Sequence, residues 1–301
     1  SLIDTLPNLD YKIMQGDSLI DEYHGIKFEK SEYDLIGIDP KLENSIKELQ
    51  IKQSEYLNLK YTKSKFEKRK QVQDQLKEIL LYVLNQKKNN SKIDKNSKIA
   101  IKNIEKNINE ISYSYAIKDF FFWKLFFSNV FNLKKGFDIV IANPPYVFTR
   151  DVDWESDYKK FIINKYLNFS ENISSTRVQA NKINLYIVFL VLSLNLINNT
   201  GISCFIIPNT ILRSVIHKGF RNYLINNSSI KEIVDLKPNT FKGVTTSPII
   251  FLSDNVYKED QKIKIIDSNF AVDEKVSTKK HHFISQKNLK NNSFFVFDIF
   301  S

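Results

Sequence analysis

The 301-residue chain has one cysteine, seven glycines and no long apolar run. Its single cysteine, Cys204, excludes an intramolecular disulfide and a cysteine-rich metal site, and it suits the reducing cytoplasm where we expect the protein. The longest apolar run, Leu185 to Leu192, is too short to span a bilayer. It predicts a buried helix or strand, and we expect no membrane partner. The four histidines lack metal-ligand spacing, so we also expect no metal.

The composition is that of a folded protein, with 42% hydrophobic and 13% aromatic residues. The net charge is +10, and residues 41–110 hold 17 basic and 9 acidic side chains. A basic excess favours polyanionic partners because binding releases counterions. Lysine-rich helices are also well solvated without any partner, and charge alone leaves the two interpretations open.

Two hydrophobic patterns organise the chain. Between Leu42 and Val83, apolar residues recur three, four or seven apart without Gly or Pro, which predicts a helical hairpin or arm ended by the polar stretch from Gln86 to Ser97. Residues 120–131, FFFWKLFFSNVF, are too aromatic to be exposed. A further helix is expected at 98–112, and short strands are expected at 11–20 and 33–38.

The second half alternates between strands and helices. Strands are predicted at 202–208, 230–236 and 247–253, and helices at about 182–198 and 210–227. This alternation predicts an α/β protein with a parallel, doubly wound sheet.

The stretch FDIVIANPPY, residues 137–146, ends a strand that we expect to be buried on both faces. Ligands bind beyond the carboxyl ends of parallel strands. Two prolines fix two φ angles and remove two backbone donors. The result is a rigid rim that offers the Asn143 side-chain oxygen and the Pro144 carbonyl as acceptors, with Pro145 and Tyr146 beside them. This suits a planar group with an exocyclic amine, such as adenine, although a strand ended by proline is the structural alternative.

The ordered set of motifs resembles the N6-adenine DNA methyltransferases of type II restriction–modification systems, above all the long type IIG polypeptides. The resemblance rests on GDSL (16–19), GFDIVIANPPYV (136–147), NLYIVFLVLSLNLI (184–197), GISCFIIPNTIL (201–212) and IVDLKPNTFKGVTTSPIIFL (233–252). It implies a Rossmann-like class I methyltransferase sheet with a helical insertion, and it implies double-stranded DNA as partner.

The resemblance also implies residue roles. Asn143 and Pro144 would bind the target amine, and Tyr146 would stack on an adenine that is flipped out of the duplex. Phe241 would be a second aromatic residue against the flipped base, with a core phenylalanine as the alternative. Asp17 would accept a hydrogen bond from the adenine amine of the cofactor S-adenosylmethionine, with a turn aspartate as the alternative.

One family element is missing from the sequence. No two of the seven glycines stand one residue apart, so the glycine-rich loop of the family is absent, and only fifteen residues precede GDSL. We therefore expect a fragment that starts inside the methyltransferase domain and lacks its N-terminal strands, with a cofactor site that is incomplete. Asp39 could be mistaken for a ribose-binding acid, but we expect it to end a strand or loop.

The expected organisation has four parts. Residues 1–40 start the methyltransferase segment, 41–112 form the basic helical insertion, 113–255 form the catalytic core, and 256–301 form a linker or the start of a target-recognition region. Nuclease and target-recognition domains of the same polypeptide are possible partners, although this chain shows no nuclease motif. Two alternatives stay open: an RNA adenine or protein glutamine methyltransferase, and a catalytically silent DNA-binding or scaffolding module.

Overall fold

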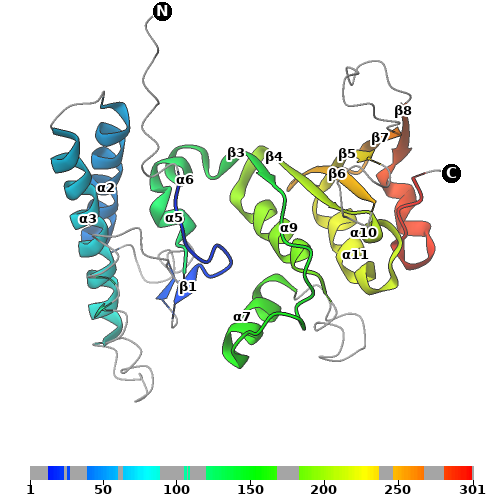
Figure 1. Cartoon of the computed structure of the whole chain (residues 1–301). Helices are drawn as coiled ribbons and strands as arrows, with labels where there is room; N and C mark the ends of the chain where they lie inside the picture. Colours follow the sequence, from blue (N-terminus) through cyan, green and yellow to red (C-terminus); the bar gives the residue numbers. More distant parts are fainter. Residues whose placement is uncertain are drawn as a thin grey trace, which may run out of the picture. The chain divides into compact units, whose positions relative to one another are not determined.

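The computed structural model describes residues 13–23, 26–27, 39–59, 64–88, 105–106, 108, 120–167, 183–236, 247–267 and 281–299. The chain divides into two compact units, residues 1–133 and 134–301, and each is described by itself. Figure 1 labels their helices and strands.

In the first unit, two helices form a hairpin. Helix α2 (Pro40–Asn58) and helix α3 (Ser64–Lys88) lie side by side (Figure 1). Each buries one apolar stripe, made of Leu42, Leu49 and Tyr56 on α2 and of Val72, Ile79, Leu80, Val83 and Leu84 on α3. The predicted hairpin is confirmed. Its first helix ends at Asn58, and its second helix ends at Lys88, two residues beyond the start of the polar stretch that was expected to end it at Gln86.

Asp39 begins α2, which corrects the expectation that it ends a strand or loop. Its Oδ1 accepts hydrogen bonds from the backbone N–H of Lys41 (3.0 Å) and Leu42 (3.4 Å). Pro40 suits the first helical turn because an N–H group at that position would have no acceptor within the helix, so proline loses no hydrogen bond there. The Tyr82 hydroxyl donates to the second carboxylate oxygen and, with the two N–H groups, lowers the pKa of Asp39. Asp39 therefore caps a helix.

The aromatic segment is buried, as predicted. It forms α5 (Trp123–Phe126) and α6 (Ser128–Lys134), and Phe120, Phe121 and Phe122 are each less than 5% exposed. The Gln53 side chain donates to the Phe126 carbonyl (3.2 Å), so this segment is hydrogen-bonded to α2.

A small hairpin of β1 (Glu22–Tyr23) and β2 (Ile26–Lys27) precedes α2. The strand predicted at 11–20 is wrong for its described residues 13–20, which contain a turn at 18–19 and no strand. The strand predicted at 33–38 and most of the helix predicted at 98–112 lie outside the described residues.

The second unit contains a six-stranded sheet in the order β3-β4-β6-β5-β7-β8. Its strands are β3 (Phe137–Ala142), β4 (Ile197–Pro208), β5 (Ser229–Asp235), β6 (Pro248–Asp254), β7 (Lys262–Asp267) and β8 (His281–Ser285). The pairs β3–β4 and β5–β7 are parallel, whereas β6 is antiparallel to both β4 and β5, and β8 to β7. The α/β class is confirmed, but a purely parallel sheet is wrong. The sequence predicts a loop and not a helix between β5 and β6, and parallel neighbours are usually joined through a crossover helix.

Residues 256–301 contribute β7 and β8 to this sheet, followed by the 3₁₀ helices η4 (Gln286–Asn291) and η5 (Ser293–Phe295). They are therefore not a linker, because their strands pair with the rest of the sheet. A target-recognition role for them stays a prediction.

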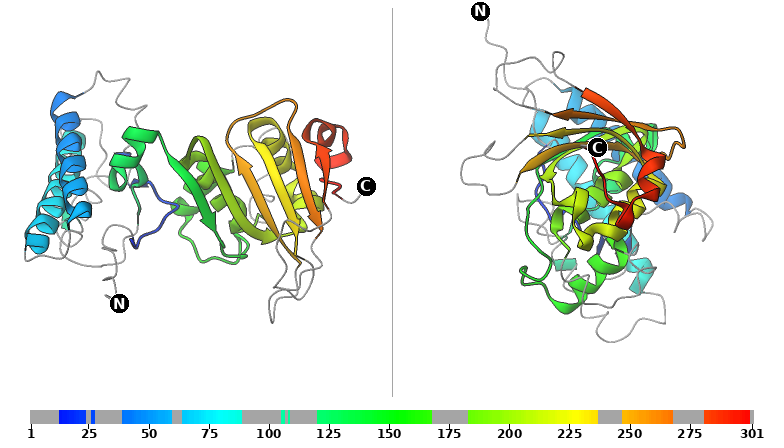
Figure 2. Two further views of the ribbon diagram at one scale, coloured as in Figure 1. Left: turned by 90° about the horizontal axis from the view of Figure 1, so that it is seen from above. Right: turned by 90° about the vertical axis from the view of Figure 1, so that its right-hand side faces the viewer.

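Helices cover one face of the sheet. Helix α9 (Leu185–Leu196) and helix α11 (Lys218–Asn227) lie on the same face (Figure 2), and α7 (Ser156–Tyr166), which the sequence did not predict, packs against α9. The single helix predicted at 210–227 is three: α10 (Thr210–Arg213), η2 (Val215–His217) and α11. Extended backbone at Ser214 (ψ 132°) separates the first two. No helix in the described part of the chain is long and apolar enough to cross a bilayer.

Strand β3 is the edge strand of the sheet, and this corrects the expectation that it is buried on both faces. Ile139 and Ile141 stand two residues apart on one face of the strand and are 64% and 76% exposed. Ile202, which is paired with Ile139 on β4, is on the same face and 37% exposed.

Two glycines allow β3 to approach the connection from α9 to β4. At Gly136 a Cβ atom would be 2.6 Å from the Leu196 carbonyl oxygen, and its φ of +156° disfavours any other residue. At Gly201 a Cβ atom would be 2.6 Å from the Phe137 carbonyl oxygen.

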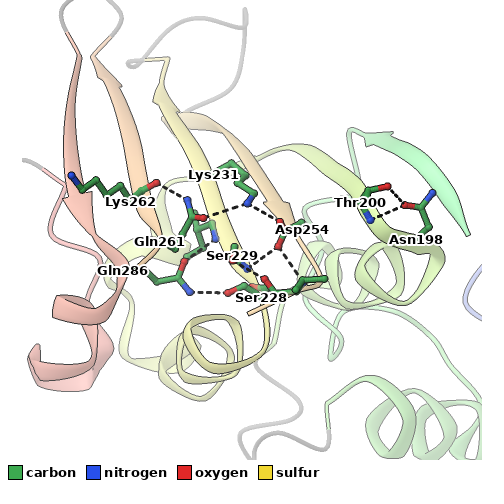
Figure 3. A network of polar contacts seen from close by, with 11 residues as sticks. Asn198, Thr200, Ser228, Ser229, Lys231, Asp254, Gln261, Lys262 and Gln286 are labelled. Atoms are coloured by element: carbon green, nitrogen blue, oxygen red, sulfur yellow. Dashed lines mark hydrogen bonds and ion pairs between the residues drawn. The ribbon is translucent and has the colours of Figure 1, made fainter. Parts of the chain in front are cut away.

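The edge of the sheet where β4 and β5 begin carries a polar network (Figure 3). Asp254 accepts from the Ser229 N–H (3.1 Å) and pairs with Lys231 (2.7 Å), and the Gln286 amide donates to the Ser228 carbonyl (2.7 Å). These contacts join β5, β6 and η4. They lie at the end of the sheet opposite the carboxyl end of β3, which Asn143 follows.

Candidate active site at the end of strand β3

Residues 143–146, Asn-Pro-Pro-Tyr, form what we call the ledge. It follows the last residue of β3, Ala142, which pairs with Phe205 near the end of β4. Asn143 and Pro145 are exposed, Pro144 is buried and Tyr146 is half-buried. The structure thus places the ledge at the carboxyl end of a strand with its amide accessible from outside, as the sequence predicted.

The Tyr146 side chain crosses to the neighbouring strand. Its hydroxyl is 2.9 Å from the Ile206 carbonyl oxygen on β4 and 3.0 Å from Asn143 Oδ1. Partial burial raises the pKa of Tyr146, so the phenol keeps its proton and can donate. The β3–β4 ladder ends at the pair Ala142–Phe205, and the Tyr146 hydroxyl therefore satisfies a carbonyl just beyond that ladder.

The chain leaving the ledge is fixed to the start of α9. The Leu185 N–H donates to the Val147 carbonyl (2.8 Å), and the Thr149 N–H donates to the Ile183 carbonyl (2.9 Å). Asn184 lies between these contacts and caps α9 through the Tyr186 N–H. The ledge is therefore held at both ends, by β3 before it and by this bridge after it.

Two buried side chains support the ledge from α9 and η2. The Tyr186 ring meets the Tyr146 ring edge-on, with centroids 6.3 Å apart and planes at 89°. The Tyr186 hydroxyl is 2.9 Å from His217 Nε2. Burial, with the positive charge of Arg221, lowers the pKa of His217 to about 4, and burial raises the pKa of Tyr186. At neutral pH the pair is therefore an uncharged phenol and an uncharged imidazole.

Arg221 on α11 is fully buried beside this pair. Its guanidinium donates to four backbone carbonyls, those of Ile211, Ser214, Phe294 and Phe295, at 2.7 to 2.9 Å. Burial lowers its pKa to about 10, so it stays charged at neutral pH. Arg221 thus hydrogen-bonds both to η5 and to the segment 211–214, which precedes η2 and His217.

The sequence did not assign roles to Tyr186 and His217. Tyr186 lies within a recognised motif but looks like one more residue of an apolar helix, and His217 was considered only as a metal ligand. Their pairing joins residues 31 positions apart, so no local pattern could have revealed it.

The other candidate residues do not belong to the ledge's unit or are not described. Asp17, in the first unit, accepts the Leu19 N–H at Oδ1 (3.0 Å), and its carbonyl accepts the Ile20 N–H (3.2 Å), which makes it the start of a turn. Its proposed contact with the cofactor stays a prediction. Phe241 lies outside the described residues.

The family model for the Eco57I restriction-modification methylase matches residues 35–241, which is more than two thirds of the chain and includes the ledge. The chain belongs to the Eco57I restriction-modification methylase family. This membership agrees with the methyltransferase resemblance of the motifs.

Individual relatives share between a quarter and a third of the aligned residues with this chain. The chain is 28% identical over 173 residues to the type I restriction enzyme MpnII methylase subunit of Mycoplasma pneumoniae, which covers 56% of this chain and 29% of the relative. It is 26% identical over 174 residues to the type II methyltransferase M.BsuBI of Bacillus subtilis, covering 54% and 32%. The chain spans less than a third of the length of these relatives.

Among solved structures, the type IIG restriction endonuclease BpuSI matches with a TM-score of 0.40 at 17% identity, covering 53% of this chain and 20% of that one. The DrdV–DNA complex matches with a TM-score of 0.38 at 16% identity, covering 63% and 24%.

Proposed function

We propose that this chain is the catalytic part of a site-specific DNA adenine-N6 methyltransferase, of the type IIG restriction–modification kind. The observation that carries the proposal is the ledge: an exposed amide at the carboxyl end of a strand, fixed on both sides, in a chain of the methylase family.

The ledge suits a primary amine attached to a ring. The Asn143 oxygen and the Pro144 carbonyl would each accept one amine hydrogen, and two fixed acceptors would turn the nitrogen lone pair away from themselves. Tyr146 would stack on the ring of the flipped base. Catalysis then comes from position and orientation, and both need the rigid backbone that two prolines supply. The methylated amine is a strong acid and can lose its proton to water without a dedicated base.

S-adenosylmethionine is the cofactor we propose, and it supplies an electrophilic methyl group when bound. Only Asp17, among the described residues, is assigned a contact with it, and Asp17 Oδ1 is already used by the Leu19 N–H. This chain also lacks the glycine-rich loop. Its own residues therefore fit the cofactor only in part.

Double-stranded DNA is the proposed partner. Helix α3 begins with a cluster of basic side chains that could contact phosphates, namely Lys65, Lys68, Arg69 and Lys70. Lys68 already pairs with Glu55 of α2 (2.5 Å), so the cluster is held on the surface of the hairpin.

The test is methylation by the protein as its gene encodes it. Wild type and Asn143→Ala are compared on long duplex DNA that lacks N6-methyladenine, with the product measured by mass spectrometry. We expect Asn143→Ala to abolish methylation and to leave DNA binding within about twofold, because the base-flipping surface keeps Tyr146. Asn199→Ala, at an exposed asparagine in the irregular start of β4, is the matched control and should methylate normally.

The alternatives predict different results. Product on RNA or on a glutamine-containing protein, with none on DNA, would reassign the substrate. If the wild-type protein binds DNA but methylates neither DNA, RNA nor the protein, the catalytically silent module is favoured. The absence of a glycine-rich loop from this sequence is the reason to consider that alternative. Methylation by Asn143→Ala at the wild-type rate would remove the amine-binding role.

A further inference from the structure

The Tyr146 hydroxyl carries one proton but faces two oxygen acceptors. The Ile206 carbonyl oxygen is 2.9 Å away and Asn143 Oδ1 is 3.0 Å away. The Ile206 carbonyl can only accept a hydrogen bond, so the hydroxyl must donate its single proton in that contact. When the hydroxyl donates to Ile206, no proton is left for Asn143 Oδ1. Lone pairs of the hydroxyl oxygen and of Oδ1 then face each other.

The Asn143 side chain can remove this conflict because it has a donor as well as an acceptor. A half-turn of the amide about its last torsion places Nδ2 where Oδ1 is now, and the two positions have nearly the same shape. Nδ2 then donates to the Tyr146 oxygen, and Tyr146 donates to Ile206. Every group in this chain of contacts has a partner, and Oδ1 is turned to the exposed side of the ledge.

We propose that Tyr146 is a positioning residue whose hydroxyl, fixed by the Ile206 carbonyl, orients the Asn143 amide so that Oδ1 is presented to the target amine. This deepens the proposed function and rests on it. The base-stacking role uses the Tyr146 ring, whereas the positioning role uses its hydroxyl, and the two can be separated by mutation.

Three features of the structure support a fixed hydroxyl. The carbonyl that anchors it belongs to β4, which lies between β3 and β6, and Ile206 itself pairs with Ile250 of β6. The Tyr186 ring meets the Tyr146 ring edge-on and limits its rotation. Partial burial raises the pKa of Tyr146, so it does not lose the proton that the contact with Ile206 needs.

The first experiment is Tyr146→Phe, which keeps the ring and removes the hydroxyl. Without it, the amide samples both orientations and one presents a donor to a donor. An amide that takes both orientations about equally is productive for only about half of the time, so we expect kcat to fall about twofold to threefold. KM for DNA should not change, because stacking remains. Tyr257→Phe, which removes a hydroxyl from a surface tyrosine of the same unit, controls for the general effect of losing a phenol group. Melting temperatures confirm that both variants fold.

The second experiment repeats the change in an Asn143→Asp background. A carboxylate has two acceptor oxygens and no orientation to lose, so Tyr146→Phe should leave the remaining activity unchanged to within about 20%. An equal loss in both backgrounds would mean that the hydroxyl acts in some other way, and the positioning role would be wrong.

A third measurement does not need activity. In protein labelled with ¹⁵N at asparagine, the Asn143 side-chain signal is assigned by its absence in Asn143→Asp. If Nδ2 donates to Tyr146, Tyr146→Phe shifts this signal upfield and speeds its hydrogen exchange. An unchanged signal would show that Oδ1 faces the hydroxyl, and would overturn the proposal.

The proposed function and the positioning role of Tyr146 can be refuted separately. Normal methylation by Asn143→Ala would refute the proposed function itself. Loss of methylation in Asn143→Ala together with wild-type kinetics in Tyr146→Phe would refute only the positioning of the amide.

Discussion

Acid should destabilise this protein through His217, and the size of the effect follows from its surroundings. His217 is 4% exposed, its Nε2 is bonded to Tyr186, and its Nδ1 has no partner among the described residues. Burial and the charge of Arg221 lower its pKa from 6.5 to about 4. The unfolded chain therefore binds a proton at a higher pH than the folded one does.

The direction follows from this difference in proton uptake. Between pH 6.5 and 4 the unfolded state holds more protons, so stability falls as the pH falls. The stability that the neutral histidine contributes is fully present above pH 6.5. It is lost as the pH falls to the pKa of His217 in the folded state, about 4. At about 1.4 kcal/mol for each pKa unit, a lowering from 6.5 to about 4 amounts to about 3 kcal/mol.

The assay compares urea unfolding at pH 7 and pH 4.5 for wild type and His217→Gln. Glutamine places an amide near the position of Nε2 and does not titrate, so the variant should lose about 2 to 3 kcal/mol less than wild type over this range. His281→Gln, at an exposed histidine on β8, is the matched control and should behave as wild type. If wild type and His217→Gln lose the same stability on acidification, His217 is not buried as a neutral group.

Three further outcomes are expected. Arg221→Met should lower the free energy of unfolding by about 3 to 5 kcal/mol in urea, because it removes a buried charge together with its hydrogen bonds to one buried and three partly buried carbonyls; a loss below 1 kcal/mol would contradict this. Gly136→Ala should cost about 2 to 4 kcal/mol by the same assay, since its Cβ meets backbone atoms at 2.6 to 2.7 Å, and a stable variant would show that β3 can shift. Replacing the four basic residues at the start of α3 by glutamine should flatten the salt dependence of DNA binding; an unchanged slope would exclude this helix from the interface.

Local patterns were sufficient for most elements between Phe137 and Asp254, whereas β7 and β8 were not predicted. The strands at 137–142, 230–236 and 247–253 and the helix at 182–198 were each predicted within a few residues, because period and composition are properties of neighbouring residues. The position of the ledge also followed from sequence, since two prolines end a strand wherever they occur. Helix α7 was missed, because its polar composition and scattered aromatic residues resemble those of a loop.

Contacts between distant residues decided the rest. The sequence could not show that β6 lies between β4 and β5 and runs against both, nor that β3 is an edge strand with exposed isoleucines. Asp39 is an exception, because its capping contacts with the Lys41 and Leu42 N–H groups are local and only its contact with Tyr82 is long-range. Above all, the partner of the Tyr146 hydroxyl is a backbone carbonyl 60 residues away. Every residue has such a carbonyl, so only the tertiary structure can say which one lies within reach.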